Sequence, residues 1–286
     1  MSHQTLICAA DLLALLGKGP VPVLLDCRFD LSDPAAGEQA HAAGHLPGAQ
    51  YLHLDHDLAG DKHGPDGRFR GRHPLPPRER FAALAGALGI TPATQVVVYD
   101  AQGGMFAARA WWMLRWIGHR SVALLDGGVQ AWQAAGGALV TGVPARNAAA
   151  APYPIALQGM PTLEVGELLQ RLGSVTVIDA RAPERYRGEV EPLDRVAGHI
   201  PGALNRFLQH NLQPDGRFKS AAALREEFAP LLAGADPSRV VHQCGSGVSA
   251  CVNLLAMEHA GLGGSALYPG SWSEWSSDPA RPVARS

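Results

Sequence analysis

The chain has 286 residues, of which 47% are hydrophobic and 17% are charged, and its formal net charge is −2 at pH 7. This composition excludes extended disorder, and the length predicts two domains of roughly 100 to 150 residues each. Because acidic and basic residues are interspersed, neither a nucleic-acid-binding nor a membrane-binding surface is expected.

The sequence carries no signal for membrane insertion, export or metal binding. No apolar segment approaches the roughly 20 residues that a membrane helix needs, and the first residues lack the features of a secretory signal. The four cysteines, Cys8, Cys27, Cys244 and Cys251, are too scattered for a disulfide framework. We therefore expect a soluble, cytoplasmic protein with no metal and no cofactor.

The chain contains a tandem repeat. LLDCRFD (24–30) returns as VIDARAPE (177–184), and GHLPGA (44–49) returns as GHIPGA (198–203). The offset is 153 residues for the first motif (24 to 177) and 154 for the second (44 to 198). This conserved order within one chain indicates a duplicated domain.

Each half alternates β-branched runs with helical stretches. QVVVYD (95–100) precedes AARAWWMLRWIG (107–118), and RVVHQ (239–243) precedes VSACVNLLAMEHAG (248–261). Continuous apolar strands between helices predict an α/β fold in each half, namely a mostly parallel sheet with helices on both faces.

The domain boundaries follow from the segment between the repeats. TGVPARNAAAAPYPIALQGMP is rich in Pro, Ala and Gly, which is typical of an extended linker. We therefore predict a first domain at 1–142, a linker at 143–160 and a second domain at 161–286.

The duplication separates scaffold from function. His45 and His199 occupy the same motif in both halves, so we interpret them as turn or packing residues. Aligning VVVYD with VVHQC sets Asp100 against Cys244, so only the second half has a thiol at the end of this strand. In parallel α/β sheets, ligands bind at this end of the strands. Cys244 is therefore the candidate functional residue.

The loop CGSGVS (244–249) has the composition of an anion-binding turn. A loop from a strand into a helix can direct several backbone N–H groups at one point, next to the positive end of the helix. Gly245 and Gly247 permit the tight turn that this requires. We expect Cys244 to be partly thiolate near neutral pH and nucleophilic.

Other interpretations of this loop stay open. GSGVSA (245–250) matches a dinucleotide-binding fingerprint, although the acidic residue expected about 20 residues later is missing. A cysteine phosphatase would need an arginine where Ala250 stands. Cys244 could also be an inert buried cysteine in a binding module.

Together, these motifs resemble the rhodanese family of sulfurtransferases over nearly the whole chain. DARAPERYRGE (179–189), GSWSEW (270–275) and both GH[LI]PGA motifs are similar to two-domain members, in which the first domain is inactive and the second is active. CGSGVS is similar to the CGSGVT loop of members that use 3-mercaptopyruvate, whereas members that prefer thiosulfate carry basic residues in this loop.

The resemblance implies an activity. Cys244 would take sulfane sulfur from 3-mercaptopyruvate as a persulfide, cradled by Gly245, Gly247, Val248 and Ser249. The sulfur would pass to a thiol acceptor, for example a thioredoxin-like protein, or to cyanide. The alternatives are a thiosulfate sulfurtransferase and a non-enzymatic binding module with a degenerate rhodanese domain.

The resemblance also implies a relay around the loop serine. It pairs Ser246 with His73 and Asp55 from the first half of the chain. A hydroxyl, an imidazole and a carboxylate in contact could polarise the substrate or move its proton.

Arginines complete the implied site. Arg187 falls where the family places a ligand for the substrate carboxylate, a contact suited to a guanidinium. Leu193 stands where a second arginine is expected, and Arg195, two residues later, is the candidate to replace it.

Overall fold

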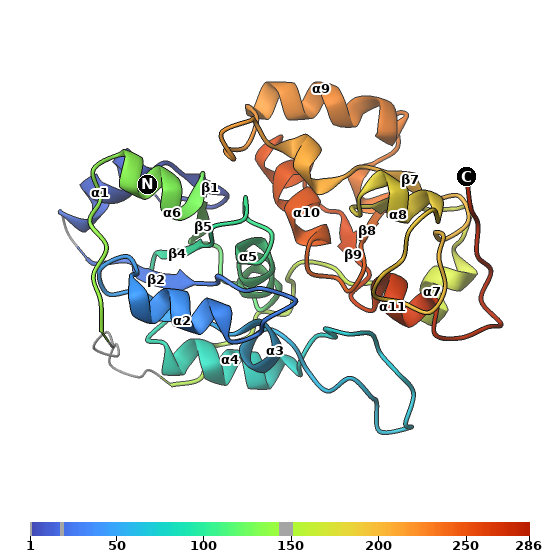
Figure 1. Cartoon of the computed structure of the whole chain (residues 1–286), viewed down its shortest axis with the longest axis horizontal. Coiled ribbons are helices and arrows are strands. Elements are labelled where there is room, and N and C mark those ends of the chain that lie inside the picture. Colours follow the sequence, from blue (N-terminus) through green and yellow to red (C-terminus); the bar gives the residue numbers. More distant parts are fainter. Residues whose placement is uncertain (1, 18–19, 143–150) are drawn as a thin grey trace. The chain divides into compact units, whose positions relative to one another are not determined.

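The computed structural model describes residues 2–17, 20–142 and 151–286 (Figure 1). They divide into two compact units. The first comprises Met1–Ala59, Pro76–Gly159 and Gln213–Phe218, and the second comprises Gly60–Leu75, Met160–Leu212 and Lys219–Ser286. The predicted linker at 143–160 stays a proposal, because its residues 143–150 lie outside the described residues.

The first unit is built on a parallel sheet of five strands in the order β1-β5-β4-β2-β3. The strands are β1 (Leu6–Ile7), β2 (Val23–Asp26), β3 (Gln50–Tyr51), β4 (Val96–Tyr99) and β5 (Val122–Leu125). All four residues of the central strand β4 are buried, as expected for a strand covered on both faces. This sheet confirms the predicted fold class for the first half.

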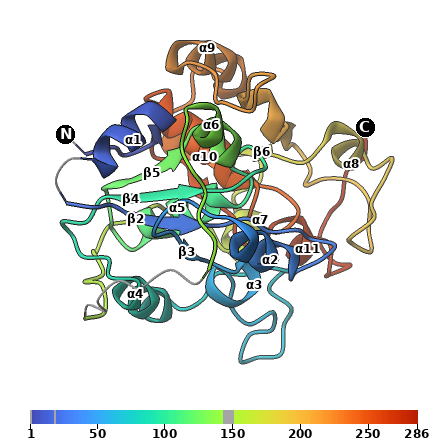
Figure 2. The ribbon, with the colours of Figure 1, turned by 60° about the vertical axis from the view of Figure 1, so that its left-hand side comes forward.

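Helices cover both faces of this sheet, as Figures 1 and 2 show. Val97 and Tyr99 of β4 share a hydrophobic cluster with Leu12 and Trp132. The alternate residues of β4 face the other side, where α5 packs against β4 and β5. The helices are α1 (Ala9–Leu16), α2 (Ala36–Ala43), α3 (Leu54–Asp57), α4 (Arg78–Ala87), α5 (Ala107–Trp116) and α6 (Gly128–Ala134).

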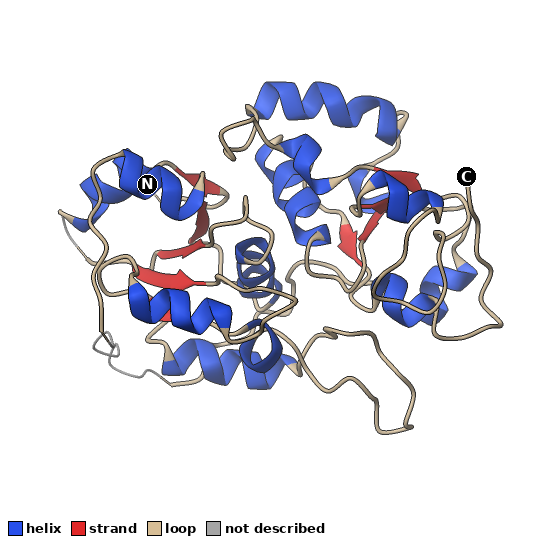
Figure 3. Cartoon of the chain, in the orientation of Figure 1, coloured by secondary structure: helices blue, strands red, loops and turns tan. Residues whose placement is uncertain are grey.

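The second unit repeats the plan with a parallel sheet of four strands in the order β7-β6-β8-β9. Figure 3 colours the strands red and the helices blue. The strands are β6 (Thr176–Asp179), β7 (Leu204–Asn205), β8 (Val240–Gln243) and β9 (Ala266–Leu267). A single parallel bridge from Thr162 to Leu267 stands where the first unit pairs β1 with β5.

The helices of the second unit also cover both faces of its sheet. Val241 of β8 shares a hydrophobic cluster with Leu168 of α7 and Trp272 of α11. On the other face, α10 packs against β8, β9 and α9. The helices are α7 (Val165–Gln170), α8 (Pro183–Arg187), α9 (Ala221–Leu232), α10 (Ala250–His259) and α11 (Ser271–Trp275), with 3₁₀ turns η1 (Leu208–Asn211) and η2 (Pro237–Arg239).

The repeated motifs form the same contacts in both units. Arg28 and Arg181 each bond to the aspartate two residues earlier, at 2.5 and 2.6 Å, and each donates a 2.8 Å bond to the glycine carbonyl of the GH[LI]PGA motif. His45 and His199 are buried, and the Nδ1 of each is 2.8 Å from a backbone carbonyl oxygen. These contacts agree with a packing role for both histidines.

Three further features bear on the protein's chemistry. In the part of the chain that the structure describes, no helix is long and apolar enough to cross a membrane. The same residues contain no group of three or more His, Cys, Asp or Glu side chains arranged to hold a metal ion. All four cysteines are free thiols, of which Cys8 is exposed and the others are buried.

Candidate active site

Cys244 directly follows β8, which pairs with β6 on one side and β9 on the other. Its side chain is buried, with 1% of its surface exposed. The loop turns back so that the Gly247 N–H donates to the Cys244 Sγ over 3.2 Å. The sulfur therefore lies within the concave face of the strand-to-helix loop, where a negative charge is favoured.

Two glycines give this loop its shape. Gly247 has φ +77°, and a Cβ there would lie 2.3 Å from the Pro269 carbonyl oxygen. A Cβ on Gly245 would lie 2.8 Å from the Arg72 Nη2. The geometry therefore requires glycine at 247, whereas a side chain at 245 would have to displace the end of the Arg72 side chain.

Val248 and Ser249, the last two residues of the loop, are buried as well. Val248 and Ser249 are each less than a tenth exposed, and Ser249 is the N-cap residue of α10. The Cys251 N–H donates to the Val248 carbonyl over 3.1 Å, and the Cys251 Sγ is 3.5 Å from the Gly247 carbonyl oxygen. The second cysteine thus contacts the loop backbone from within the helix.

Ser271, the first residue of α11, holds the backbone of Cys244. Its Oγ accepts a 3.1 Å bond from the Cys244 N–H and donates a 2.9 Å bond to the Tyr268 carbonyl. Its φ is +53°, which is uncommon for a residue other than glycine. Sequence reasoning missed this role: the family motif GSWSEW contains Ser271, but nothing in the motif signals a positive φ or a bond to a residue 27 positions away.

The next residues of α11 continue the same contact. The Trp272 N–H donates to the Cys244 carbonyl over 3.0 Å, and the Ser273 N–H donates to the Gly245 carbonyl over 2.9 Å. The start of α11 therefore fixes both peptide groups that flank the Cys244 side chain.

Ser246 and His73 are in contact. The Ser246 Oγ and the His73 Nδ1 are 2.8 Å apart, and both side chains are 7% exposed. Asp55 is half-buried in α3 of the first unit, where its N–H donates to the His53 Nδ1 over 3.1 Å. The place of Asp55 beside His73 stays a prediction.

The two arginines of RYRG have different surroundings. Arg187 is 42% exposed and forms an ion pair of 2.7 Å with Glu189, so its contacts do not support the predicted role at the substrate. Arg185 is 18% exposed, and its Nη1 would lie 3.5 Å from a Cβ on Gly245. Residues two apart on a helix point about 200° apart, so only one of these side chains can face the loop.

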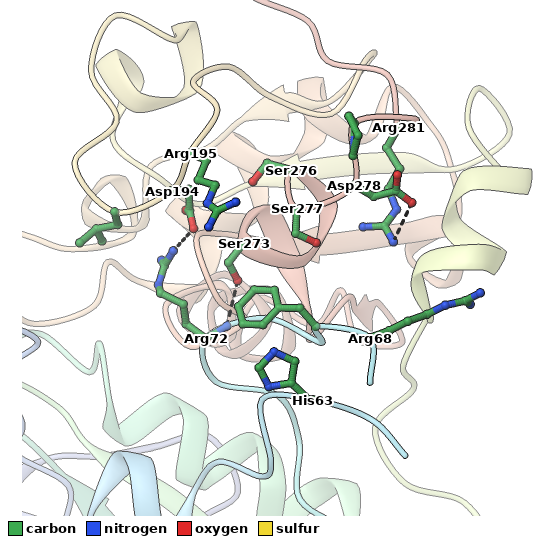
Figure 4. A pocket seen from close by; sticks show the side chains of 13 residues that line it. His63, Arg68, Arg72, Asp194, Arg195, Ser273, Ser276, Ser277, Asp278 and Arg281 are labelled. Atoms are coloured by element: carbon green, nitrogen blue, oxygen red, sulfur yellow. Dashed lines mark hydrogen bonds and ion pairs between the residues drawn. The ribbon is translucent and has the colours of Figure 1, made fainter. Parts of the chain in front are cut away.

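An alternating chain of charges adjoins the loop. The Arg185 Nη2 donates to the Glu191 Oε1 over 2.6 Å and lies 3.5 Å from the Asp194 Oδ2. The Arg72 Nη1 donates to the Asp194 Oδ1, as the dashed line in Figure 4 marks. Burial raises the pKa of the Asp194 carboxyl, although Arg72 bonds to it.

A cavity of about 750 Å³ lies beside these groups in the second unit. Figure 4 shows the side chains around it, and its charged lining comprises Arg68, Arg72, Arg195, Arg281, Asp194 and Asp278. Arg195 is exposed on this wall, and Leu193 is 49% exposed. Sequence reasoning did not select Arg72. Its Nη2 would lie 2.8 Å from a Cβ on Gly245, so this side chain adjoins the cysteine loop. It also contacts Asp194, 122 residues later in the sequence.

The paired units and the cysteine loop agree with one family. A model of the rhodanese-like domain matches the chain twice, over residues 9–135 and 164–278. The chain therefore belongs to the rhodanese family, with one such domain in each half, which confirms both the resemblance and the duplication predicted from the sequence.

Individual relatives extend along the whole chain. The chain is 44% identical to a probable 3-mercaptopyruvate sulfurtransferase of Pseudomonas aeruginosa, with 99% of both chains covered. It is 42% identical to the putative thiosulfate sulfurtransferase SseB of Mycobacterium tuberculosis, covering 99% of this chain and 97% of that one. Among solved structures, 3-mercaptopyruvate sulfurtransferase from Leishmania major matches with a TM-score of 0.83 and 30% identity, covering 96% of this chain and 74% of that one.

Proposed function

We propose that this protein is a sulfurtransferase that takes sulfane sulfur from 3-mercaptopyruvate onto Cys244 and passes it to an acceptor thiol or to cyanide. The observation that carries the proposal is the placement of the Cys244 Sγ, which accepts the Gly247 N–H inside the loop at the end of a central strand. A thiolate and a terminal persulfide sulfur are both anions, and such a loop favours an anion.

The proposed reaction has two displacements. The Cys244 thiolate attacks the sulfur of 3-mercaptopyruvate, so that an S–S bond forms while the C–S bond breaks, and the carbon fragment takes up a proton to leave as pyruvate. An acceptor thiolate then attacks the outer sulfur, and the S–S bond breaks to restore the Cys244 thiolate.

The other loop residues have roles in this scheme. The Ser246–His73 pair, at 2.8 Å, suits proton transfer to the leaving carbon fragment. We retain Asp55 as the proposed third member of this relay. Gly245, Gly247, Val248 and Ser249 supply the buried backbone around the outer sulfur.

We assign the donor carboxylate to Arg185 in place of Arg187. The guanidinium of Arg185 lies near Gly245, whereas Arg187 is engaged with Glu189 at the surface. A guanidinium can bond to a carboxylate through two N–H groups, which fixes its orientation as well as its position. Arg187→Ala is therefore a matched control for Arg185→Ala, which should raise KM for 3-mercaptopyruvate by about tenfold.

Thiosulfate is the second candidate donor. CGSGVS has no basic side chain, which favours 3-mercaptopyruvate, but Arg72 and Arg185 bring positive charge to Gly245 from outside the loop. A compact dianion would benefit from such charge.

Intact mass spectrometry tests the proposed function. Incubation of the wild type with 3-mercaptopyruvate, without acceptor, should add one sulfur atom, and faster than thiosulfate does. Cys244→Ala should gain none. Sulfur uptake by Cys244→Ala, or no uptake from either donor by the wild type, would contradict the proposal, whereas faster uptake from thiosulfate would reverse the order of the donors.

The acceptor and the location are also proposals. A thioredoxin-like protein is the kind of thiol acceptor that we expect. The free state of all four cysteines agrees with a reducing compartment, and we propose the cytoplasm.

A further inference from the structure

We propose that residues 61–70 form a movable flap over the cavity that adjoins the cysteine loop, and that this flap controls access to Cys244. The same hairpin occurs at 213–218, where it belongs to the first unit and is fixed in place. The flap would act on any molecule that approaches the thiol, so it does not depend on the proposed donor.

The two hairpins share a motif and a backbone structure. PDGRF stands at 65–69 and again at 214–218. In both copies the motif glycine has a positive φ, +75° and +81°, and its N–H donates to the carbonyl three residues earlier, at 2.9 and 3.0 Å. The N–H of that earlier residue donates in turn to the carbonyl of the motif arginine, at 2.9 and 2.7 Å. Any difference in movement between the hairpins therefore comes from their surroundings.

The hairpin at 214–218 is fixed to the first unit. The Phe218 N–H donates to the Asp126 Oδ1 over 2.8 Å, and the Phe218 side chain is 3% exposed. The Cε2 of this ring would lie 3.6 Å from a Cβ on Gly104, in the loop that follows β4. A hydrogen bond to a carboxylate and a buried aromatic ring both oppose movement of this hairpin.

The flap at 61–70 lacks this anchor. LYPGS (267–271) stands where the first half has LLDGG, so Pro269 replaces Asp126 and offers no carboxylate. Among the described residues, the Phe69 N–H has no hydrogen-bond partner, and the flap forms hydrogen bonds and ion pairs only within itself. The Phe69 ring is half-buried, in contrast to its buried counterpart in the first unit.

Both ends of the flap are anchored, and a glycine stands at each end. The Gly60 N–H donates to the Pro74 carbonyl over 2.8 Å. Gly71 has φ +103°, and a Cβ there would lie 2.7 Å from the Gly270 carbonyl oxygen. Because glycine adopts a wider range of backbone angles than other residues, the flap can turn about these two fixed points.

The flap forms one side of the cavity of about 750 Å³. Figure 4 shows His63 and Arg68 of the flap along this side. The cavity adjoins the cysteine loop, because Ser273 lines it and donates its N–H to the Gly245 carbonyl over 2.9 Å. Movement of the flap would therefore widen or narrow the approach to Cys244, which is 1% exposed.

Neutral alkylating reagents of two sizes test the control of access. We would compare N-ethylmaleimide with a larger, uncharged maleimide by their rates of reaction at Cys244, followed on the Cys244 peptide by mass spectrometry. In a shortened variant, Asn-Gly replaces residues 63–69 and joins Lys62 to Arg70, whose N–H already donates to the Lys62 carbonyl over 2.8 Å. The larger reagent should react about fivefold faster with this variant than with the wild type, and N-ethylmaleimide less than about twofold faster.

The controls separate access from a general loosening of the fold. Cys8, an exposed thiol of the first unit, should react at the same rate in both proteins. Phe69→Ala, which keeps the hairpin, should raise the rate of the larger reagent at Cys244 about twofold. Unchanged Cys244 rates in both variants, or an equal rise for the two reagents, would overturn the proposal. If no donor delivers sulfur to Cys244 but the size-dependent rise appears, the proposed function fails and the flap stands.

NMR relaxation measures the movement itself on two glycine amides of one protein. Gly67 and Gly216 occupy the same position in the two hairpins. Gly67 should have an order parameter below about 0.6 or show exchange on the microsecond to millisecond timescale, whereas Gly216 should stay near about 0.85. Asp126→Ala should make Gly216 as mobile as Gly67, and Asp126→Asn, which keeps an oxygen acceptor, should not. Two equally rigid glycines in the wild type would refute a movable flap.

Discussion

The loops that follow the central strands of the two units share a backbone plan but surround different side chains, a carboxylate in the first unit and a thiol in the second. After β4, the carboxylate of Asp100 accepts four backbone N–H groups, at 2.9 to 3.0 Å, from Gln102, Gly104, Phe106 and Ala107. After β8, Cys244 stands in the equivalent position and accepts the Gly247 N–H. The first loop is an anion-binding site filled by the chain's own side chain.

The Asp100 loop indicates which charged group the Cys244 loop could bind. In aspartate the Oδ atoms are two bonds beyond Cβ, and in a cysteine persulfide the outer sulfur is also two bonds beyond Cβ. Asp100 therefore resembles a permanent copy of the charged intermediate that we propose on Cys244. The backbone N–H groups bind a permanent carboxylate in the first unit, and the equivalent groups would bind the charged persulfide intermediate in the second.

The largest expected effect comes from making the second loop like the first. Cys244→Asp should lower sulfur transfer by at least about 10³-fold, because no nucleophilic sulfur remains. It should also unfold at a higher temperature than Cys244→Ala, since the carboxylate can accept loop N–H groups that alanine leaves unpaired. Transfer assays and thermal unfolding of both variants check this, and a Cys244→Asp protein less stable than Cys244→Ala would break the comparison.

The reverse change removes the internal anion of the first loop. Asp100→Ala leaves four backbone N–H groups, three of them buried, without their acceptor, so the free energy of unfolding should fall by about 3 kcal/mol or more. Denaturant unfolding measures this loss. Asp30→Ala is the control, because Asp30 is exposed and bonds to nearby Ser32, and this change should leave the free energy of unfolding nearly unchanged. Equal losses in the two variants would show that the first loop is not an anion-binding site.

A smaller effect is expected at the position where the first unit has a glycine and the second has a serine, both with a positive φ. Gly128 has φ +59° and Ser271 has φ +53° at equivalent positions, and the residues that follow donate to the carbonyls of Asp100 and Cys244 at 3.1 and 3.0 Å. Ser271→Gly should lower the free energy of unfolding by less than about 2 kcal/mol, because glycine adopts this φ without strain and so offsets part of the cost of an unpaired Cys244 N–H. It should lower kcat/KM about tenfold, because the Cys244 N–H loses its acceptor.

Steady-state kinetics and thermal unfolding, measured together, test this separation. Unchanged kcat/KM in Ser271→Gly would show that the hydroxyl does not position the thiol. A large loss of stability would show that its role is structural alone.

The last expected effect is confined to acid and is absent at neutral pH. His242 in β8 is fully buried where β4 has Val98, and burial lowers its pKa to about 3 from 6.5. The folded state holds it neutral, so stability is fully present above about pH 6.5 and is lost as the pH falls toward 3, by up to about 1.4 kcal/mol per pH unit. His242→Val should weaken this dependence of unfolding free energy on pH. An identical slope in the variant would mean that other groups cause the acid sensitivity.

The sequence predicted those features that depend on local pattern and on repetition. Apolar runs predicted the positions of β4 and β8, and the mismatch of Asp100 with Cys244 selected the candidate functional loop. Gly247 was identifiable because the tight turn after the strand requires a positive φ. These inferences need only neighbouring residues or a comparison of the two halves.

Features that depend on side-chain direction or distant contact were not predictable. Arg185 and Arg187 share one motif, and only the phase of α8 decides which of them faces Gly245. Arg72 reaches Asp194 across 122 positions, and the positive φ of Ser271 has no sequence signal. Three-dimensional packing, not composition, determines these contacts.

We propose that the Cys244 loop holds a terminal sulfur as the Asp100 loop holds a carboxylate. A crystal structure of the protein after reaction with 3-mercaptopyruvate, without acceptor, tests it directly. We predict a persulfide on Cys244 whose outer sulfur accepts backbone N–H groups of residues 246–249 and superposes on the Asp100 carboxylate oxygens when β8 is fitted to β4. An outer sulfur that points out of the loop, with no backbone N–H within hydrogen-bond distance, or a persulfide on Cys251 instead, would contradict the account.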